Sequence, residues 1–281
     1  MQSITAGKIP IFFTAGEETA AELIRGVCEQ TLRLVRENWG LAPPEDCRIH
    51  VMTSGPGFMF QAAPGLRRIY LAATFPLWVF HVRRMWPISG GWTLRFGRRT
   101  AIGIKPPRLM IRSDRRIGER IFVEEKDPVA RVRTTACHEL THACASGLAL
   151  PMWLNEGVAM LTVDRCLGRP TVRRDTLSRV REYSPKRASP GYREIQRMGD
   201  DAMVYHTSRG YWLTNYLEAA RPGFLRTLFA RRRDETSIER ETAAALGMAP
   251  ETFWRDIDGR IAAHFIGPVD LAGNGWKDTT A

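Results

Sequence analysis

The feature that most constrains the fold of this chain is a helix with strong local start and stop signals that carries two histidines four residues apart. Asp127 is a natural N-cap, Pro128 suits the first helical position, and Gly147 ends the pattern. Because each helical residue turns the chain by about 100°, His138 and His142 lie about 40° apart and one turn along the axis. Both imidazoles can therefore face one point.

The residues around these histidines predict a zinc site. Zinc accepts two imidazole nitrogens at about 2.0–2.1 Å. Glu139 lies about 100° round from His138, where its carboxylate can reach a metal-held water without binding the metal. The resulting H-E-x-x-H pattern predicts two ligands and a general base. Cys137 and Cys144 lie far round the helix from the histidines and are interpreted as small buried apolar groups.

A third ligand is expected from a second helix over residues 151–167. A catalytic zinc takes three protein ligands and leaves one position for water. In an antiparallel helical hairpin, His142 and Glu156 lie equally far from the turn and at a similar height, which predicts Glu156 as the third ligand. Asp164 is the alternative ligand, but it lies about two turns further along and could instead hydrogen-bond a ligand imidazole. Gly157 leaves room for close helix packing or a nearby ligand.

The string H-E-L-T-H at 138–142, followed by W-L-N-E-G-V-A at 153–159, resembles the gluzincin metallopeptidases, the clan of thermolysin and the zinc aminopeptidases. The resemblance covers about residues 128–165 and is closest to the short peptidase-MA-like domains. It implies a zincin-like fold, one zinc ion bound by two histidines and the later glutamate, and Glu139 as the general base. The connection between the ligands is shorter than in thermolysin, and the G-x-M-E-N string of aminopeptidases is absent, so the resemblance does not imply exopeptidase activity.

The resemblance also implies a tyrosine that donates to the oxyanion from the start of a later helix. Tyr205 occupies the matching position, with Tyr211 and His206 as alternatives, and packing in the core is the competing interpretation. A peptidase of this type binds its substrate as an extra strand on a sheet edge. Residues 100–105 are the candidate edge strand, in which Gly103 would permit close approach of a peptide backbone.

Periodicity predicts an α+β chain with a small mixed sheet in its first half and helices in its second half. The predicted strands are 8–13, 48–52, a hairpin or two short strands over 90–105, and a further strand near 109–112 or 120–123. The predicted helices outside the motif are 17–39, 69–86 (around Pro76 and packed on the core), 202–220, 222–232, 236–246 and 250–264. The expected connections are a turn at 54–57 and a long surface segment over 168–200. The expected domains are a catalytic core over 1–167, a helical part over 168–267 that completes the cleft, and a loose tail over 268–281.

Composition narrows the partners. The 281 residues carry a formal net charge of +11, and nearly all of the basic residues are arginine. Such a charge would attract nucleic acid, an acidic surface or acidic substrates, and a simple compositional bias towards arginine is the competing interpretation. No nucleic-acid motif accompanies these arginines, so nucleic acid is not the expected partner. Five cysteines without a C-x-x-C pair, no signal peptide and no expected membrane span favour a cytoplasmic protein.

A zinc metallopeptidase acting on peptides or proteins is the leading hypothesis. A non-catalytic zinc-containing binding protein and a basic nucleic-acid-binding protein are the alternatives.

Overall fold

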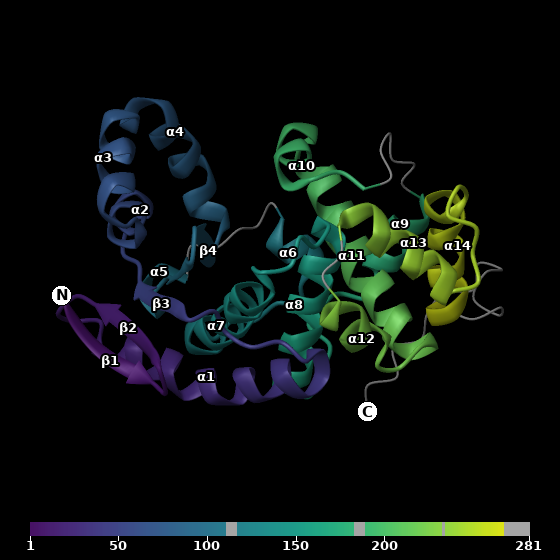
Figure 1. Cartoon of the computed structure of the whole chain (residues 1–281), viewed down its shortest axis with the longest axis horizontal. Coiled ribbons are helices and arrows are strands. Elements are labelled where there is room, and N and C mark those ends of the chain that lie inside the picture. The colour runs from purple at the N-terminus through teal and green to yellow at the C-terminus, as the bar shows by residue number, and fades with distance from the viewer. Residues whose placement is uncertain (111–116, 183–188, 232–233, 267–281) are drawn as a thin grey trace.

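The computed structural model describes residues 1–110, 117–182, 189–231 and 234–266, and within these it shows an α+β chain with one mixed sheet (Figure 1). The expectation of a small mixed sheet in the first half and helices in the second half is confirmed. Within the described ranges, no helix combines the length and apolar character needed to cross a bilayer.

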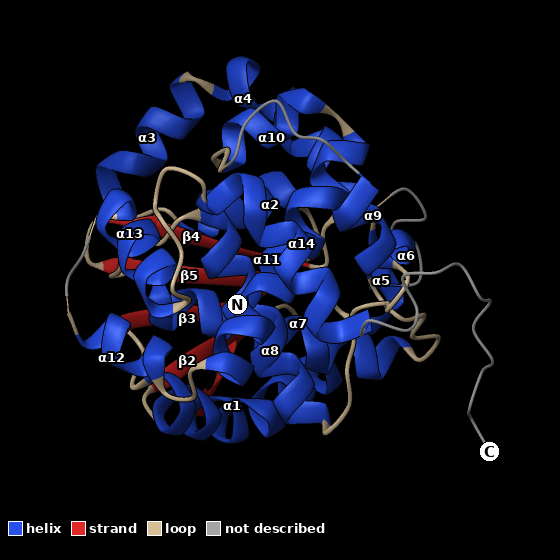
Figure 2. Cartoon of the chain, turned by 90° about the vertical axis from the view of Figure 1, so that its right-hand side faces the viewer, coloured by secondary structure: helices blue, strands red, loops and turns tan. Residues whose placement is uncertain are grey.

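The sheet has the strand order β1-β2-β3-β5-β4, and Figure 2 shows β2, β3, β5 and β4 side by side. The β2–β3 and β3–β5 pairs are parallel, whereas β1–β2 and β4–β5 are antiparallel. The predicted strands 8–13 and 48–52 and the predicted hairpin are confirmed, and β1 was not predicted. The strands are β1 (Gln2–Ala6), β2 (Ile9–Phe13), β3 (Asp46–Val51), β4 (Gly91–Phe96) and β5 (Arg99–Ile104).

The prediction that residues 100–105 form an edge strand was wrong. This segment is β5, which pairs with β3 on one side and with β4 on the other, so the edge belongs to β4. Residues 100–104 are all buried, as expected for a strand covered on both faces. The burial pattern of β4 is broken by partly exposed residues, as suits an edge strand.

Three helices pack against one another, and the first two of them along the chain also pack on the sheet. They are α1 (Glu18–Trp39), α7 (Pro128–Ala145) and α8 (Met152–Leu167), and all three were predicted. A core cluster joins sheet residues such as Ile11, Ile49 and Ile102 to Ile24 of α1 and Leu140 of α7. The face of α7 that carries Leu140 is therefore fixed against the sheet.

The second half of the chain is helical. The predicted helices 202–220, 222–232, 236–246 and 250–264 are confirmed as α11 (Asp200–Ala220), α12 (Phe224–Ala230), α13 (Glu235–Ala245) and α14 (Phe253–Ile266). The largest core cluster runs from Trp39 of α1 through Leu154 and Val158 of α8 to Ile257 of α14, so it crosses residue 167 without a break. The expected tail, 268–281, lies outside the described residues.

The prediction that residues 168–200 form a long surface connection was wrong. The segment contains α9 (Thr176–Glu182) and α10 (Tyr192–Met198). Leu177 and Val180 of α9 are buried in the main core, and Ile195 of α10 is buried as well. Such short helices have little stability of their own, and tertiary packing of a few apolar residues accounts for them.

Residues 55–88 fold into helices that project from the sheet at the upper left of Figure 1. The expected turn at 54–57 is instead the start of α2, where the hydroxyl of Ser54 accepts a hydrogen bond from the amide of Gly57 at 3.1 Å. The predicted helix 69–86 is divided at Thr74. Its first part, α3, buries none of its residues, whereas α4 buries Val79 and Val82, so the expected packing is met by α4 and not by α3. These elements are α2 (Gly55–Ala62), α3 (Gly65–Ala73), α4 (Phe75–Met85) and the 3₁₀ helix η1 (Trp86–Ile88).

The further strand expected near 109–112 or 120–123 is not formed where the structure describes those residues. Two one-turn helices, α5 (Pro107–Met110) and α6 (Gly118–Ile121), stand there instead, and residues 111 and 112 lie outside the described ranges. Only an isolated antiparallel bridge joins Phe122 to Val172. Both one-turn helices lie close to the candidate site described next.

Candidate metal centre

The helical hairpin of α7 and α8 positions the candidate ligands. The carboxylate of Asp127 accepts hydrogen bonds from the amides of Val129 at 2.9 Å and Ala130 at 3.3 Å, which fixes the start of α7 as predicted. Pro151 stands immediately before α8. The turn between the two helices therefore sets the height at which their side chains meet.

Two glycines let α8 and α11 pack backbone against backbone. A Cβ atom on Gly157 would lie 2.0 Å from Oγ1 of Thr214 and 2.5 Å from the carbonyl oxygen of Gly210. A Cβ atom on Gly210 would lie 2.5 Å from the carbonyl oxygen of Trp153. Close helix packing, one of the two roles foreseen for Gly157, is therefore the one observed, and it holds the adjacent Glu156 in place.

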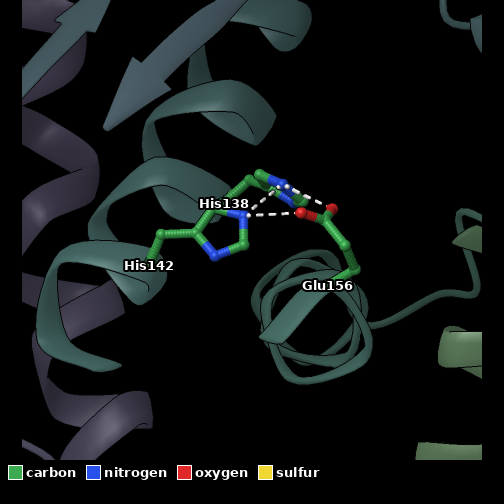
Figure 3. A group of neighbouring side chains, drawn as sticks. All are labelled: His138, His142 and Glu156. Carbon is green, nitrogen blue, oxygen red and sulfur yellow. Dashed lines mark hydrogen bonds and ion pairs between the residues drawn. The ribbon is translucent and has the colours of Figure 1, made fainter. Parts of the chain in front are cut away.

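His138, His142 and Glu156 converge on one point between α7 and α8 (Figure 3). The two Nε2 atoms of the histidines lie 2.9 Å apart. Nε2 of His138 lies 3.5 Å from Oε2 of Glu156, and Nε2 of His142 lies 3.5 Å from Oε1. The structure thus brings together all three residues predicted as metal ligands.

The donor set fits a zinc ion. Donor atoms held tetrahedrally at about 2.0–2.1 Å from zinc lie about 3.3–3.4 Å from one another, close to the separations of 2.9 and 3.5 Å seen here. Two imidazole nitrogens with one carboxylate is also a common ligand set of catalytic zinc. Asp164 does not join this group.

Electrostatics couple the three side chains. Burial favours the neutral form of His138, but the hydrogen bond and charge of Glu156, with the charge of Glu139, outweigh it and raise the pKa of His138. Burial acts on Glu156 in the opposite sense, yet His142, His138 and Tyr192 lower the pKa of Glu156 to about 2. The carboxylate therefore stays ionised, as a metal ligand must.

Glu139 lies beside this group, against the edge strand. Its Oε2 accepts a hydrogen bond from the Thr93 hydroxyl of β4 at 2.7 Å, and the same hydroxyl lies 3.0 Å from the Glu139 carbonyl oxygen. A Cβ atom on Gly91 would lie only 2.6 Å from Cγ of Glu139. Strand β4 thus packs directly against Glu139, and the hydroxyl of Thr93 orients its carboxylate.

Tyr192 is the site residue that the sequence interpretation missed. Its hydroxyl donates to Oε1 of Glu156 at 2.6 Å and accepts from the side-chain amide of Asn155 at 2.7 Å. The residue is 43% exposed, but its hydroxyl is withdrawn from water, and this burial together with Glu156 raises the pKa of Tyr192 well above 10. Tyr192 lies in α10, within the segment that was interpreted as a surface connection, so local pattern carried no signal for it.

The other predicted polar residues lie away from the three ligands. The Tyr205 hydroxyl donates to Asp258 at 2.7 Å, and this ring is almost fully buried in the core. The Tyr211 hydroxyl donates to Asp164 at 2.7 Å, and Asp164 also accepts from the Thr171 hydroxyl and amide rather than from a ligand imidazole. His206 is also buried.

Cys137 and Cys144 are buried free thiols, as predicted. Burial is a main reason that their pKa values are raised, and a hydrogen bond with Cys166 contributes most at Cys137. Both side chains are therefore neutral at physiological pH and do not take part in the ligand group.

A cavity of about 380 Å³ opens onto the group of ligands. His138, Glu139 and Glu156 line it, together with the one-turn helix α6 and the beginning of β4. Its apolar wall consists of Met85, Ile88, Met110, Ile117, Ile121, Phe122, Val123, Met160, Val163, Leu167 and Met203. The candidate centre is therefore reachable from a chamber large enough for an amino-acid side chain.

Comparison with known proteins adds no family to these observations. No family model matches the chain, and the search of curated proteins finds no match to it.

Proposed function

We propose that this protein is a zinc-dependent hydrolase of zincin-like architecture, most simply a metallopeptidase. The observation that carries the proposal is the convergence of His138, His142 and Glu156 on one point, with Glu139 beside them on the wall of the same cavity. A structural metal site would not require a carboxylate at this position or an open chamber.

The chain's own groups supply what amide hydrolysis requires. A zinc ion held by the three side chains would acidify a bound water and polarise the substrate carbonyl. Glu139, oriented by Thr93, takes the proton of the water and passes it to the leaving amine. The Tyr192 hydroxyl lies at the ligand group and is a candidate donor to the oxyanion in place of Tyr205, a role in which its proton would turn from Glu156 to the substrate.

Strand β4 offers a place for the peptide. It pairs with β5 on one side, and no strand in the described part of the chain pairs with its other side. The contacts of Gly91 and Thr93 with Glu139 place this free edge beside the candidate base. A peptide that adds to β4 as an extra strand would therefore carry its scissile bond past Glu139.

The cavity favours a bulky apolar side chain next to the scissile bond. Its two arginines are already engaged, since Arg169 pairs with Glu125 at 2.9 Å and Arg131 donates to the carbonyl oxygens of Glu125 and Met110. The excess of arginine in the whole chain, which favours acidic substrates, thus acts outside this chamber.

Metal content is the first test. We expect about one zinc per chain by elemental mass spectrometry after extensive dialysis, and loss of that zinc in His138→Ala. A chain that holds no metal even after zinc is added would refute the proposal.

Glu139→Gln separates binding from catalysis. This variant should keep its zinc and lose peptide hydrolysis by a factor of about 100 or more, since it removes the proton acceptor. Glu124→Gln is the matched control, because Glu124 is an exposed carboxylate on the same cavity, and it should retain activity. If the chain binds zinc but Glu139→Gln and the parent act alike on a peptide library, the site belongs to a non-catalytic zinc-binding protein.

A further inference from the structure

The hairpin of α3 and α4 displays large apolar side chains to solvent. It projects from the sheet at the upper left of Figure 1. Leu66 is 84% exposed, Leu77 is 83% exposed and Phe80 is 71% exposed. Most of the exposed large apolar residues in the described chain lie between residues 66 and 80.

The exposed residues follow the spacing of a buried helix face. Leu66, Ile69, Tyr70 and Ala73 recur on one side of α3 at intervals of three and four, a pattern that normally faces a core. All four are exposed, and no part of the chain that the structure describes covers them. The apolar face of α3 is therefore available to a partner.

The hairpin is held together from its inner side, independently of this exposed face. Phe60, Phe75 and Trp78 form an aromatic cluster, with ring centroids 5.2–6.2 Å apart. The indole nitrogen of Trp78 donates to the carbonyl oxygen of Leu71 at 2.9 Å, which ties α4 to α3. The outer apolar residues are thus not needed to close the hairpin.

The charge of the hairpin is of one sign. Arg67, Arg68, Arg83 and Arg84 lie on it, and the sequence contains no aspartate or glutamate between Asp46 and Asp114. All four arginines are exposed. The hairpin therefore combines apolar side chains with uncompensated positive charge.

We propose that the α3–α4 hairpin docks on an anionic lipid surface, with Leu66, Leu77 and Phe80 entering the interface and the arginines contacting phosphate groups. Interfacial helices combine these two features. A second copy of this chain would bring arginines against arginines, and a nucleic acid would leave the apolar side chains in water. Met85, near the base of the hairpin, lines the cavity, so docking would hold the cavity near a membrane. The docking itself does not depend on the metal.

The test is co-sedimentation of the full chain with vesicles of phosphatidylcholine that contain or lack phosphatidylglycerol. We expect binding to the anionic vesicles only. Combined Leu66→Ser, Leu77→Ser and Phe80→Ser should weaken this binding by about tenfold for each side chain, because each substitution removes a large apolar group that the lipid interface would bury. Combined Arg67→Gln and Arg84→Gln should weaken it by about fivefold for each charge.

The matched control is combined Arg33→Gln and Arg36→Gln, which removes the same charge from exposed positions on α1 and should bind almost as the parent does. Circular dichroism should show that every variant is folded, since all substituted side chains are exposed. The proposal is overturned if the parent stays in solution with anionic vesicles, or if the triple serine variant sediments as the parent does. It is also overturned if light scattering shows a dimer that the serine variant dissociates, because the hairpin would then be a self-association surface.

Discussion

Glu156 is the residue at which the parts of the candidate centre meet. Its two carboxylate oxygens face the two imidazoles, and Oε1 also accepts the hydroxyl proton of Tyr192. A ligand held in this way has one orientation. Partners that orient a ligand commonly affect metal affinity or activity by about 10–100-fold, so Tyr192 is expected to matter even though it does not bind the metal.

Tyr192→Phe tests this role. We expect the variant to fold normally and to lose about 10–100-fold in zinc affinity or in kcat/KM, because the hydroxyl that fixes Glu156 is gone. Zinc titration by competition with a chromogenic chelator, followed by peptide-hydrolysis kinetics, measures the two effects separately.

Tyr205→Phe is the companion variant, since Tyr205 was the oxyanion donor predicted from the resemblance. Its hydroxyl is bound to Asp258 in the core, so we expect a loss of about 1 kcal/mol in the free energy of unfolding and little change in kcat. If Tyr205→Phe abolishes turnover while Tyr192→Phe does not, the assignment of Tyr192 is wrong.

The crossing of α8 and α11 is where element packing controls the site. Gly157→Ala would place a methyl group 2.0 Å from Oγ1 of Thr214 and against the backbone of Gly210. Because backbone cannot yield cheaply, we expect a loss of about 1–3 kcal/mol in the free energy of unfolding. We also expect weaker zinc binding, through displacement of the adjacent Glu156. Thermal unfolding with and without zinc measures both.

Gly147→Ala is the control for that substitution. A Cβ atom there would meet nothing within 4 Å, and the residue lies in the turn between the same two helices. The free energy of unfolding and the zinc affinity of Gly147→Ala should stay close to those of the parent. Equal destabilisation by the two substitutions would show that the α8–α11 contact is not the cause.

Helices that begin at a capping residue or a proline were predictable from the sequence, whereas contacts between segments far apart in the chain were not. Asp127 and Pro128 start α7 and Pro151 precedes α8, so the hairpin and its three ligand-type residues follow from short-range chemistry. The order of the strands depends on non-local pairing: β5 pairs with both β3 and β4, so β4 forms the edge of the sheet. Tyr192 reaches Glu156 only because α10 packs beside α11, a contact that no short window of sequence encodes.

At the scale of the whole molecule, the core encloses polar groups that the candidate centre does not use. His50 of β3 is buried between the rings of Phe12 and Phe58, with centroids at 5.1 and 5.8 Å. Within the described chain, neither of its ring nitrogens has a hydrogen-bond partner. Burial, and then the charges of Arg48 and Arg99, lower the pKa of His50 from 6.5 to about 4.

His50 therefore links folding to pH. The folded chain binds a proton at His50 more weakly than the unfolded chain does. Protonation of His50 therefore costs no stability above about pH 6.5, and the free energy of unfolding falls as the pH drops from there towards 4. The slope approaches about 1.4 kcal/mol per pH unit within that window. Urea unfolding of the metal-free chain at intervals from pH 7.5 to 4.5 should show this decline, and His50→Leu should remove about one proton from the slope. An unchanged slope in His50→Leu would mean that other groups, such as His206, whose pKa burial also lowers to about 4, carry the acid sensitivity.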